Sequence, residues 1–209
     1  MMSDAADDEW GDLKAFFQKY GRLMFYTILA AAIAIGGVFY YRHYKERQGL
    51  LAAALYQEAL NAASQNRLNL AQAAAHRLER EFTATPYADQ GALLLARIAY
   101  QQNHVPAAID ALTFAAHHGD WMLRTVARLR LSDLLLATGH PHQAWHYAQI
   151  AKPYGFKTLV LGLQAQILMR EGHTQKARAR LVEALKDAPP KSALTTLWRR
   201  ELAQLQGVS

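Results

Sequence analysis

The chain has 209 residues, of which 52% are hydrophobic and 19% charged, and it carries a formal net charge of +6. This length suits one membrane segment and one folded domain of about 150 residues. The sequence contains no cysteine, which excludes disulfide scaffolds, thiolate zinc sites and cysteine nucleophiles. Alanine and leucine dominate while proline and glycine are few, so helix is favoured over nearly the whole chain.

The first segment, residues 1–22, contains apolar residues that recur at helical spacing. They are Trp10, Leu13, Phe16, Phe17 and Tyr20. This stripe is typical of an amphipathic helix that lies in the membrane interface. It is equally compatible with a helical extension of the following segment, with the stripe packed or facing lipid.

Residues 23–41 form an uncharged run of 19 residues between Arg22 and Arg42. A helix of this length spans roughly 28 Å, close to the thickness of the hydrocarbon core. Aromatic residues lie near both ends, as in the aromatic belts of membrane helices. The sequence therefore predicts a transmembrane helix. The flanking arginines argue against a buried core helix, and the apolar run continues too far beyond Ala32-Ile33-Ala34 for a cleaved signal peptide.

The orientation of this span does not follow from charge. Three basic residues lie in residues 1–22 and three in residues 42–49, so the positive-inside rule gives a tie for the segments that flank the span. The segment 42–49, which contains the three basic residues on the far side, is interpreted as a juxtamembrane linker.

Residues 50–209 repeat a pattern typical of helical hairpins. Asn or Gly turns recur at positions 66, 103, 139 and 172, which are 37, 36 and 33 residues apart. These spacings are near the 34-residue period of tetratricopeptide repeats. Small residues keep register with the turns, which would let paired helices approach closely. Seven positions before each turn, these residues are Ala59, Ala96, Ser132 and Ala165. Five positions after each turn, they are Ala71, Ala108, Ala144 and Ala177. Another seven positions along the chain, the residues are Leu78, Ala115, Ala151 and Ala184.

The predicted fold class is all-α. We expect an N-terminal transmembrane helix, then a tetratricopeptide-like α-solenoid of about four helical hairpins, in which neighbouring hairpins share one core. Ser192 is placed to be the N-cap of a last helix that closes the open end of this core. The apolar stripe of that capping helix is formed by Leu194, Leu197, Trp198, Leu202 and Leu205.

In arrays of this type, partners usually dock on the concave side, which the first helix of each hairpin lines. Counting from the small positions predicts a protein-binding groove that presents a cation, an anion, an amide, an aromatic ring and a thioether. Such a mixture suits an extended polypeptide. The alternative is that some of these residues pack beneath the next repeat. The six groove residues are Arg97, Tyr100, Asp133, Leu136, Gln166 and Met169.

Catalytic, metal and cofactor sites are not indicated. His142 and His146 are four residues apart, as in some zinc sites, but no acid lies near them in the sequence. No Gly-rich phosphate loop, nucleophile elbow or carboxylate pair is present, so no enzyme activity is expected. The repeat region carries the whole net charge of +6, because the first 48 residues hold six basic and six acidic residues. Without a basic cluster that also contains aromatics, contact with lipid headgroups or an acidic partner is favoured over nucleic acid.

Taken in order along the chain, these features resemble the YfgM-type family of tetratricopeptide-like proteins, which are ancillary subunits of the SecYEG translocon. The likeness covers nearly the whole chain. The stretches that carry it are Leu13-Lys14-Ala15-Phe16-Phe17, Phe39-Tyr40-Tyr41-Arg42, Ala54-Leu55-Tyr56-Gln57-Glu58-Ala59, Gly91-Ala92-Leu93-Leu94-Leu95-Ala96, Leu129-Arg130-Leu131 and Gly172-His173-Thr174-Gln175-Lys176-Ala177.

The resemblance implies a bacterial inner-membrane protein with a cytoplasmic N-terminus and a periplasmic repeat domain. It also implies association with SecYEG and with a membrane-anchored periplasmic chaperone of the prolyl-isomerase type, in support of unfolded secretory polypeptides. A generic membrane-tethered adaptor in another envelope complex is the alternative that the residues leave open. This chain departs from the family pattern in being more basic and richer in histidine.

Overall fold

The computed structural model describes the backbone of residues 4–206. Side chains are described from Arg22 to Leu205, apart from Leu23, Ile28 and Tyr154. The chain divides into two compact units, one up to Leu50 and one from Leu51 onward.

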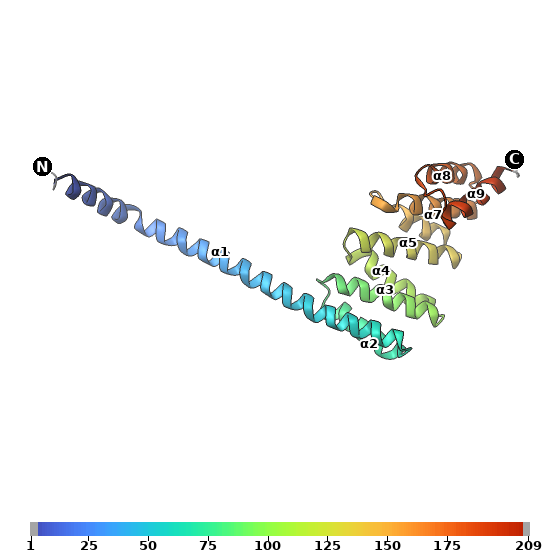
Figure 1. The fold of residues 1–209 in the computed structure, drawn as a ribbon, viewed down its shortest axis with the longest axis horizontal. Helices are drawn as coiled ribbons and strands as arrows, with labels where there is room; N and C mark the ends of the chain where they lie inside the picture. The colour runs from blue at the N-terminus through green and yellow to red at the C-terminus, as the bar shows by residue number, and fades with distance from the viewer. Residues whose placement is uncertain (1–3, 207–209) are drawn as a thin grey trace. The chain divides into compact units, whose positions relative to one another are not determined.

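Residues 4–206 form helices joined by turns, with no strand among them (Figure 1). This confirms the all-α prediction. The α-helices are α1 (Asp4–Ser64), α2 (Leu68–Glu81), α3 (Pro86–Gln101), α4 (Val105–His118), α5 (Trp121–Ala137), α6 (Pro141–Ala148), α7 (Lys157–Arg170), α8 (Thr174–Asp187) and α9 (Ala193–Gln206), and a short 3₁₀ helix, η1 (Tyr154–Phe156), precedes α7.

Helix α1 contains a segment that is long and apolar enough to cross a membrane. The candidate segment begins at Met24, and none of its most apolar window is buried. The helix continues without a break through residues 42–49, which the sequence analysis treats as a linker. The apolar stripe predicted for residues 1–22 lies outside the side chains that the structure describes.

The second unit is a stack of helical hairpins. Its first helices are the last part of α1, then α3, α5 and α7, and its second helices are α2, α4, α6 and α8. Each helix from α2 to α9 contacts the next one along the chain, and the first helices also contact one another, α3 with α5 and α5 with α7. Figure 1 shows this succession from α2, in cyan and green, to α9, in red.

Each hairpin turn has the same hydrogen-bonded geometry. The turn residues Asn66, Asn103, Gly139 and Gly172 all have positive φ, at 56°, 62°, 83° and 77°. The amide that follows each of them donates to the carbonyl five residues earlier, at 2.8 Å in all four turns. This is the Schellman arrangement, which ends a helix on a left-handed residue. Gly adopts that conformation without strain and Asn tolerates it better than most residues, which explains the residue types at the four turns.

The small residues in register with the turns lie at the helix contacts. All four alanines that follow the turns, Ala71, Ala108, Ala144 and Ala177, are fully buried. The small residues that precede the turns are at most 5% exposed. Their burial confirms the prediction that these small side chains lie at the contact between the two helices of each hairpin.

The register fails at one predicted position, Ala151. Helix α6 ends at Ala148, and Ala151 is exposed in the following turn. Pro153 has no amide hydrogen to donate into a continued helix, and its ring disfavours helical backbone at the preceding residue. The prediction of a helical contact at Ala151 is therefore wrong.

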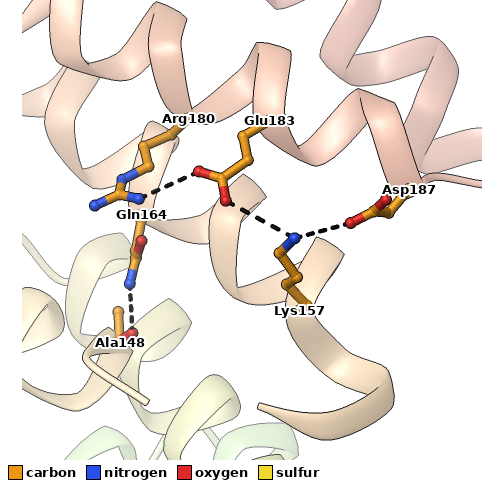
Figure 2. A network of polar contacts seen from close by, with 6 residues as sticks. All are labelled: Ala148, Lys157, Gln164, Arg180, Glu183 and Asp187. Atoms are coloured by element: carbon orange, nitrogen blue, oxygen red, sulfur yellow. Dashed lines mark hydrogen bonds and ion pairs between the residues drawn. The ribbon is translucent and has the colours of Figure 1, made fainter. Parts of the chain in front are cut away.

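Helix α6 is short, and the carbonyl groups at its C-terminal end accept hydrogen bonds from side chains of neighbouring helices. The guanidinium of Arg128, in α5, donates to the carbonyls of His146, Tyr147 and Gln149 at 3.1–3.3 Å. The amide of Gln164, in α7, donates to the carbonyl of Ala148 at 2.8 Å (Figure 2). Because such carbonyls have no partner within the helix, these bonds fix the shortened helix between its neighbours.

Figure 2 also shows how the start of α7 is held against α8. The Lys157 ammonium donates to Asp187 at 2.9 Å and lies 3.8 Å from Glu183, which also contacts Arg180. The hydrogen bond to Asp187, together with the charge of that carboxylate, raises the pKa of Lys157. The first helix of the fourth hairpin is thus tied at its start to the end of its partner helix.

The last helix, α9, packs on the end of the stack as predicted. The Ser192 hydroxyl accepts a hydrogen bond from the amide of Thr195 at 3.1 Å, so Ser192 is the N-cap. Trp198 is 3% exposed and lies against α7 at Gly162, where an added Cβ would come within 2.4 Å of the indole ring. Leu194 and Leu197, which belong to the predicted stripe, are instead about 40% exposed.

A matched pair in α8 tests the role of the small contacts. Ala177→Leu should reduce the free energy of unfolding by about 1–3 kcal/mol, because the position is fully buried and has no room for a larger side chain. Ala179→Leu, at an exposed position in the same helix, is the control and should leave the melting curve of the full chain in detergent nearly unchanged. Equal melting temperatures for the two variants would contradict the assigned helix contact.

Candidate protein-binding groove

A hollow of about 480 Å³ lies between the first helices α3 and α5. Its floor is formed mainly by small and apolar side chains, including Ala96 of α3 and Ala108 and Leu112 of α4. Its walls carry Arg97 and Tyr100 from α3 and Arg130 and Asp133 from α5. The hollow is therefore apolar at its base and charged at its rim, which is the usual composition of a ligand groove.

Helix geometry explains why these four side chains converge. Residues three apart on a helix lie on one face, so Arg97 stands beside Tyr100 and Arg130 beside Asp133. Ala96 and Ala108 belong to the small positions that let α3 and α4 approach closely. Their short side chains also leave the space above them open. Tyr100 is 61% exposed beside this space.

Three of the six predicted groove residues line the hollow, namely Arg97, Tyr100 and Asp133. Leu136 is only 8% exposed and belongs to the hydrophobic core around α4, α5 and α6. The Gln166 amide donates to the carboxylate of Glu201 in α9 at 3.2 Å. Met169 is partly buried. The described hollow is thus confined to the second and third hairpins, because the capping helix engages the corresponding face of α7.

Arg130 is a groove residue that the sequence analysis did not select. Its position three residues before Asp133 repeats the spacing of Arg97 and Tyr100, and this spacing could have identified it. In the sequence Arg130 lies close to two other arginines, Arg124 and Arg128. The structure separates them, because Arg128 binds the end of α6 while Arg130 lines the groove.

Comparison with known families supports the architecture that the turns and small contacts indicate. The model of the tetratricopeptide repeat-like domain matches residues 14–206, which is most of the chain. The chain belongs to the tetratricopeptide repeat-like family. No curated protein matches the sequence closely enough to add a more specific relative.

Domains of the tetratricopeptide repeat-like family are typically protein–protein interaction modules without catalytic activity, and the groove has the character of such a module. Its rim offers two cations, one anion and an aromatic ring above an apolar floor. These groups can orient a peptide and pack against its side chains.

A second hollow, of about 530 Å³, lies among α6, α7 and α8. His142 lies 3.2 Å from Glu171, the residue that follows α7, so a distant part of the chain supplies an acid that the local sequence around His142 lacks. His173, Lys176 and Arg180 also line this hollow. Within residues 22–205, no three His, Cys, Asp or Glu side chains are placed to hold a metal ion.

Asp89 is a buried carboxylate near the start of α3, outside the groove. It is 4% exposed, and its Oδ1 atom has no hydrogen-bond partner. Burial raises the pKa of Asp89 to about 6, from an ordinary value of 3.8. The charges of His118 and Arg124 oppose this rise in pKa, whereas the charge of Asp120 adds to it.

The pKa of Asp89 predicts a pH-dependent cost to folding. Because the folded-state pKa is above the ordinary value, folding favours the protonated carboxyl, and stability falls as the pH rises from about 4 to about 6. Asp89→Asn removes this cost. Its free energy of unfolding at pH 7.5 should exceed that of the wild type by up to about 3 kcal/mol, at about 1.4 kcal/mol per unit of pKa difference.

Chemical denaturation of the full chain in detergent at pH 4 and pH 7.5 measures this difference. The advantage of Asp89→Asn over the wild type should shrink at pH 4, where the wild-type carboxyl is largely protonated. Asp110→Asn, at an exposed carboxylate of α4, is the control and should show no such pH-dependent advantage. The same advantage for Asp89→Asn at both pH values would contradict the shifted pKa.

Proposed function

We propose that this protein is a membrane-anchored interaction module whose groove binds extended segments of polypeptide. It acts as an ancillary subunit of the bacterial SecYEG translocon, beside a membrane-anchored prolyl-isomerase-type chaperone, and its groove receives secretory polypeptides as they emerge. The observation that carries this proposal is the hollow between α3 and α5. There, an exposed tyrosine and three charged side chains surround an apolar floor.

The composition of the groove favours an unfolded chain over a small ligand. Arg97, Arg130 and Asp133 can bond to backbone carbonyls and amides, which every polypeptide offers. Tyr100 adds a large contact area at a low cost in conformational entropy, and Leu93 and Leu134 add apolar contact. None of these contacts requires one particular peptide sequence. A protein that assists many secreted proteins needs such tolerance.

The membrane anchor supports placing this groove beside a membrane channel. Helix α1 provides a span, and the likeness to YfgM-type proteins supports a cytoplasmic N-terminus, a periplasmic repeat domain and an inner-membrane location. The flanking segments 1–22 and 42–49 carry three basic residues each, so charge near the span does not favour this orientation over its reverse. The alternative function, an adaptor in another envelope complex, uses the same architecture and differs in the partner alone.

Photo-crosslinking from the groove in native membranes distinguishes these two functions. A benzoylphenylalanine in place of Tyr100 should crosslink to secretory polypeptides and to SecYEG subunits, because this side chain is 61% exposed in the groove. The same probe in place of Arg178, which is exposed on the second helix α8, is the control and should not give these products. Crosslinks from position 100 to a different envelope complex would support the adaptor instead.

A groove variant separates binding from folding. Arg97→Ala combined with Asp133→Ala should abolish the crosslinks from position 100 and leave the melting curve unchanged, since both side chains are exposed. Crosslinks that persist in this variant, with the same partners, would exclude the groove as the binding site.

A further inference from the structure

The first helices of the second unit all start at the same edge of that unit. The helices α3, α5 and α7 run parallel, because a single antiparallel helix separates each from the next. Tyr56, near the start of this unit, contacts Tyr87 in the first turn of α3, with ring centroids 5.9 Å apart. Leu51, where the unit begins, therefore lies at the same edge as the starts of α3, α5 and α7.

Exposed apolar side chains recur along this edge, which we name the anchor edge. Each lies at or near the first turn of a first helix or of α9. They are Leu51 (59% exposed), Trp121 and Met122 (both 48%), Leu159 (38%) and Leu194 (42%). Large apolar side chains at this level of exposure lower the free energy if they leave water.

The opposite edge has a different character. It consists of the four Schellman turns, whose residues are asparagine, glycine, histidine and other polar types. Beside these turns, among the side chains that the structure describes, the large hydrophobic side chains with high exposure are Leu70 of α2 and the groove residue Tyr100 of α3. The two edges of one stack thus differ in polarity, although the same repeat builds both.

Exposed positive charges lie at the anchor edge, which suits contact with the phosphate groups of lipids. Lys152 and Lys191 are exposed in the turns that precede α7 and α9. Two acids at this edge, Asp120 and Asp187, have partners within the protein. As the N-cap of α5, Asp120 accepts hydrogen bonds from the backbone amides of Met122 and Leu123, both at 2.9 Å. Asp187 forms an ion pair with Lys157.

The chain itself keeps the anchor edge near a bilayer. Only residues 42–50 separate Tyr41, at the end of the uncharged run, from Leu51. They span about 14 Å as a helix and at most about 30 Å when extended. A surface held within such a distance meets the lipid headgroups at a high effective concentration, so weak contacts suffice for docking.

We infer that the anchor edge docks on the headgroup region of the bilayer that holds α1. Trp121, Met122 and Leu194 insert among the headgroups, a region that tryptophan favours, while Lys152 and Lys191 lie over lipid phosphates. This inference rests on the membrane anchoring in the proposed function. It goes beyond that function by assigning the surface that sets how the groove is held relative to the membrane.

Because the chain has no cysteine, single cysteines give unique labelling sites. Spin labels are placed on the full chain through Met122→Cys and Leu194→Cys at the anchor edge, His140→Cys at the opposite edge and Ile33→Cys in the span. Each labelled chain is reconstituted singly in a nanodisc of phosphatidylethanolamine and phosphatidylglycerol. The measurement is the accessibility of the label to oxygen relative to a water-soluble nickel complex.

The labels at positions 122 and 194 should show an oxygen-to-nickel ratio several-fold higher than the label at position 140. Equal ratios at 122, 194 and 140, with a lipid-like ratio at 33, would overturn the docking inference and leave the anchoring intact. A water-like ratio at position 33 would overturn the anchoring, and the docking with it. A single chain per disc excludes burial of the labels by a second copy.

Charge reversal tests the contribution of the lysines. Lys152→Glu combined with Lys191→Glu should lower the oxygen-to-nickel ratio at position 122, because carboxylates repel the anionic headgroups. Lys176→Glu, at an exposed lysine of α8 away from this edge, is the control and should not change the ratio. Melting curves establish that the exposed substitutions leave the fold intact. A ratio at position 122 that is unaffected by the double reversal would remove the lysines from the docking surface.

Discussion

The architecture of the repeat domain depends on a single left-handed residue at each hairpin turn. Asn66, Asn103, Gly139 and Gly172 end a first helix with positive φ, and the next amide closes the same hydrogen bond in all four hairpins. That bond reverses the chain within a few residues and returns the second helix along the first. The small residues before and after each turn then meet at the helix contact. Any other turn length would rotate them away from it.

Close approach of the helices also shapes the functional surfaces. Ala96 and Ala108 are part of the buried contact between α3 and α4, and they form the floor of the groove. A larger residue at either position would force the helices apart and also fill the groove. Stability and the shape of the groove therefore depend on the same small side chains. The rim residues Arg97, Tyr100 and Asp133 are exposed and free of this packing constraint, so they can be substituted without loss of the fold.

Local sequence predicts those features of this fold that depend on local chemistry. The four turns, the buried alanines beside them and the N-cap at Ser192 follow from backbone preferences and side-chain size, and the structure contains all of them. Features that depend on a distant partner could not be predicted in this way. The core position of Leu136 and the bond from Gln166 to Glu201 of α9 require the packing of neighbouring helices, as do the bonds from Arg128 to the end of α6. The error at Ala151 is different, because Pro153 two residues later was available as a local signal.

A comparison of two glycines measures the constraint of the left-handed turn most directly. Neither Gly139 nor Gly155 has an atom within 4 Å of an added Cβ, and only Gly139 has positive φ. If the left-handed turn sets the hairpin, Gly139→Ala should lower the free energy of unfolding by about 1–2 kcal/mol. Gly155→Ala should change it by less than about 0.5 kcal/mol. Denaturation of the two variants in parallel gives the difference. Equal stabilities would show that the turn conformation does not constrain the fold.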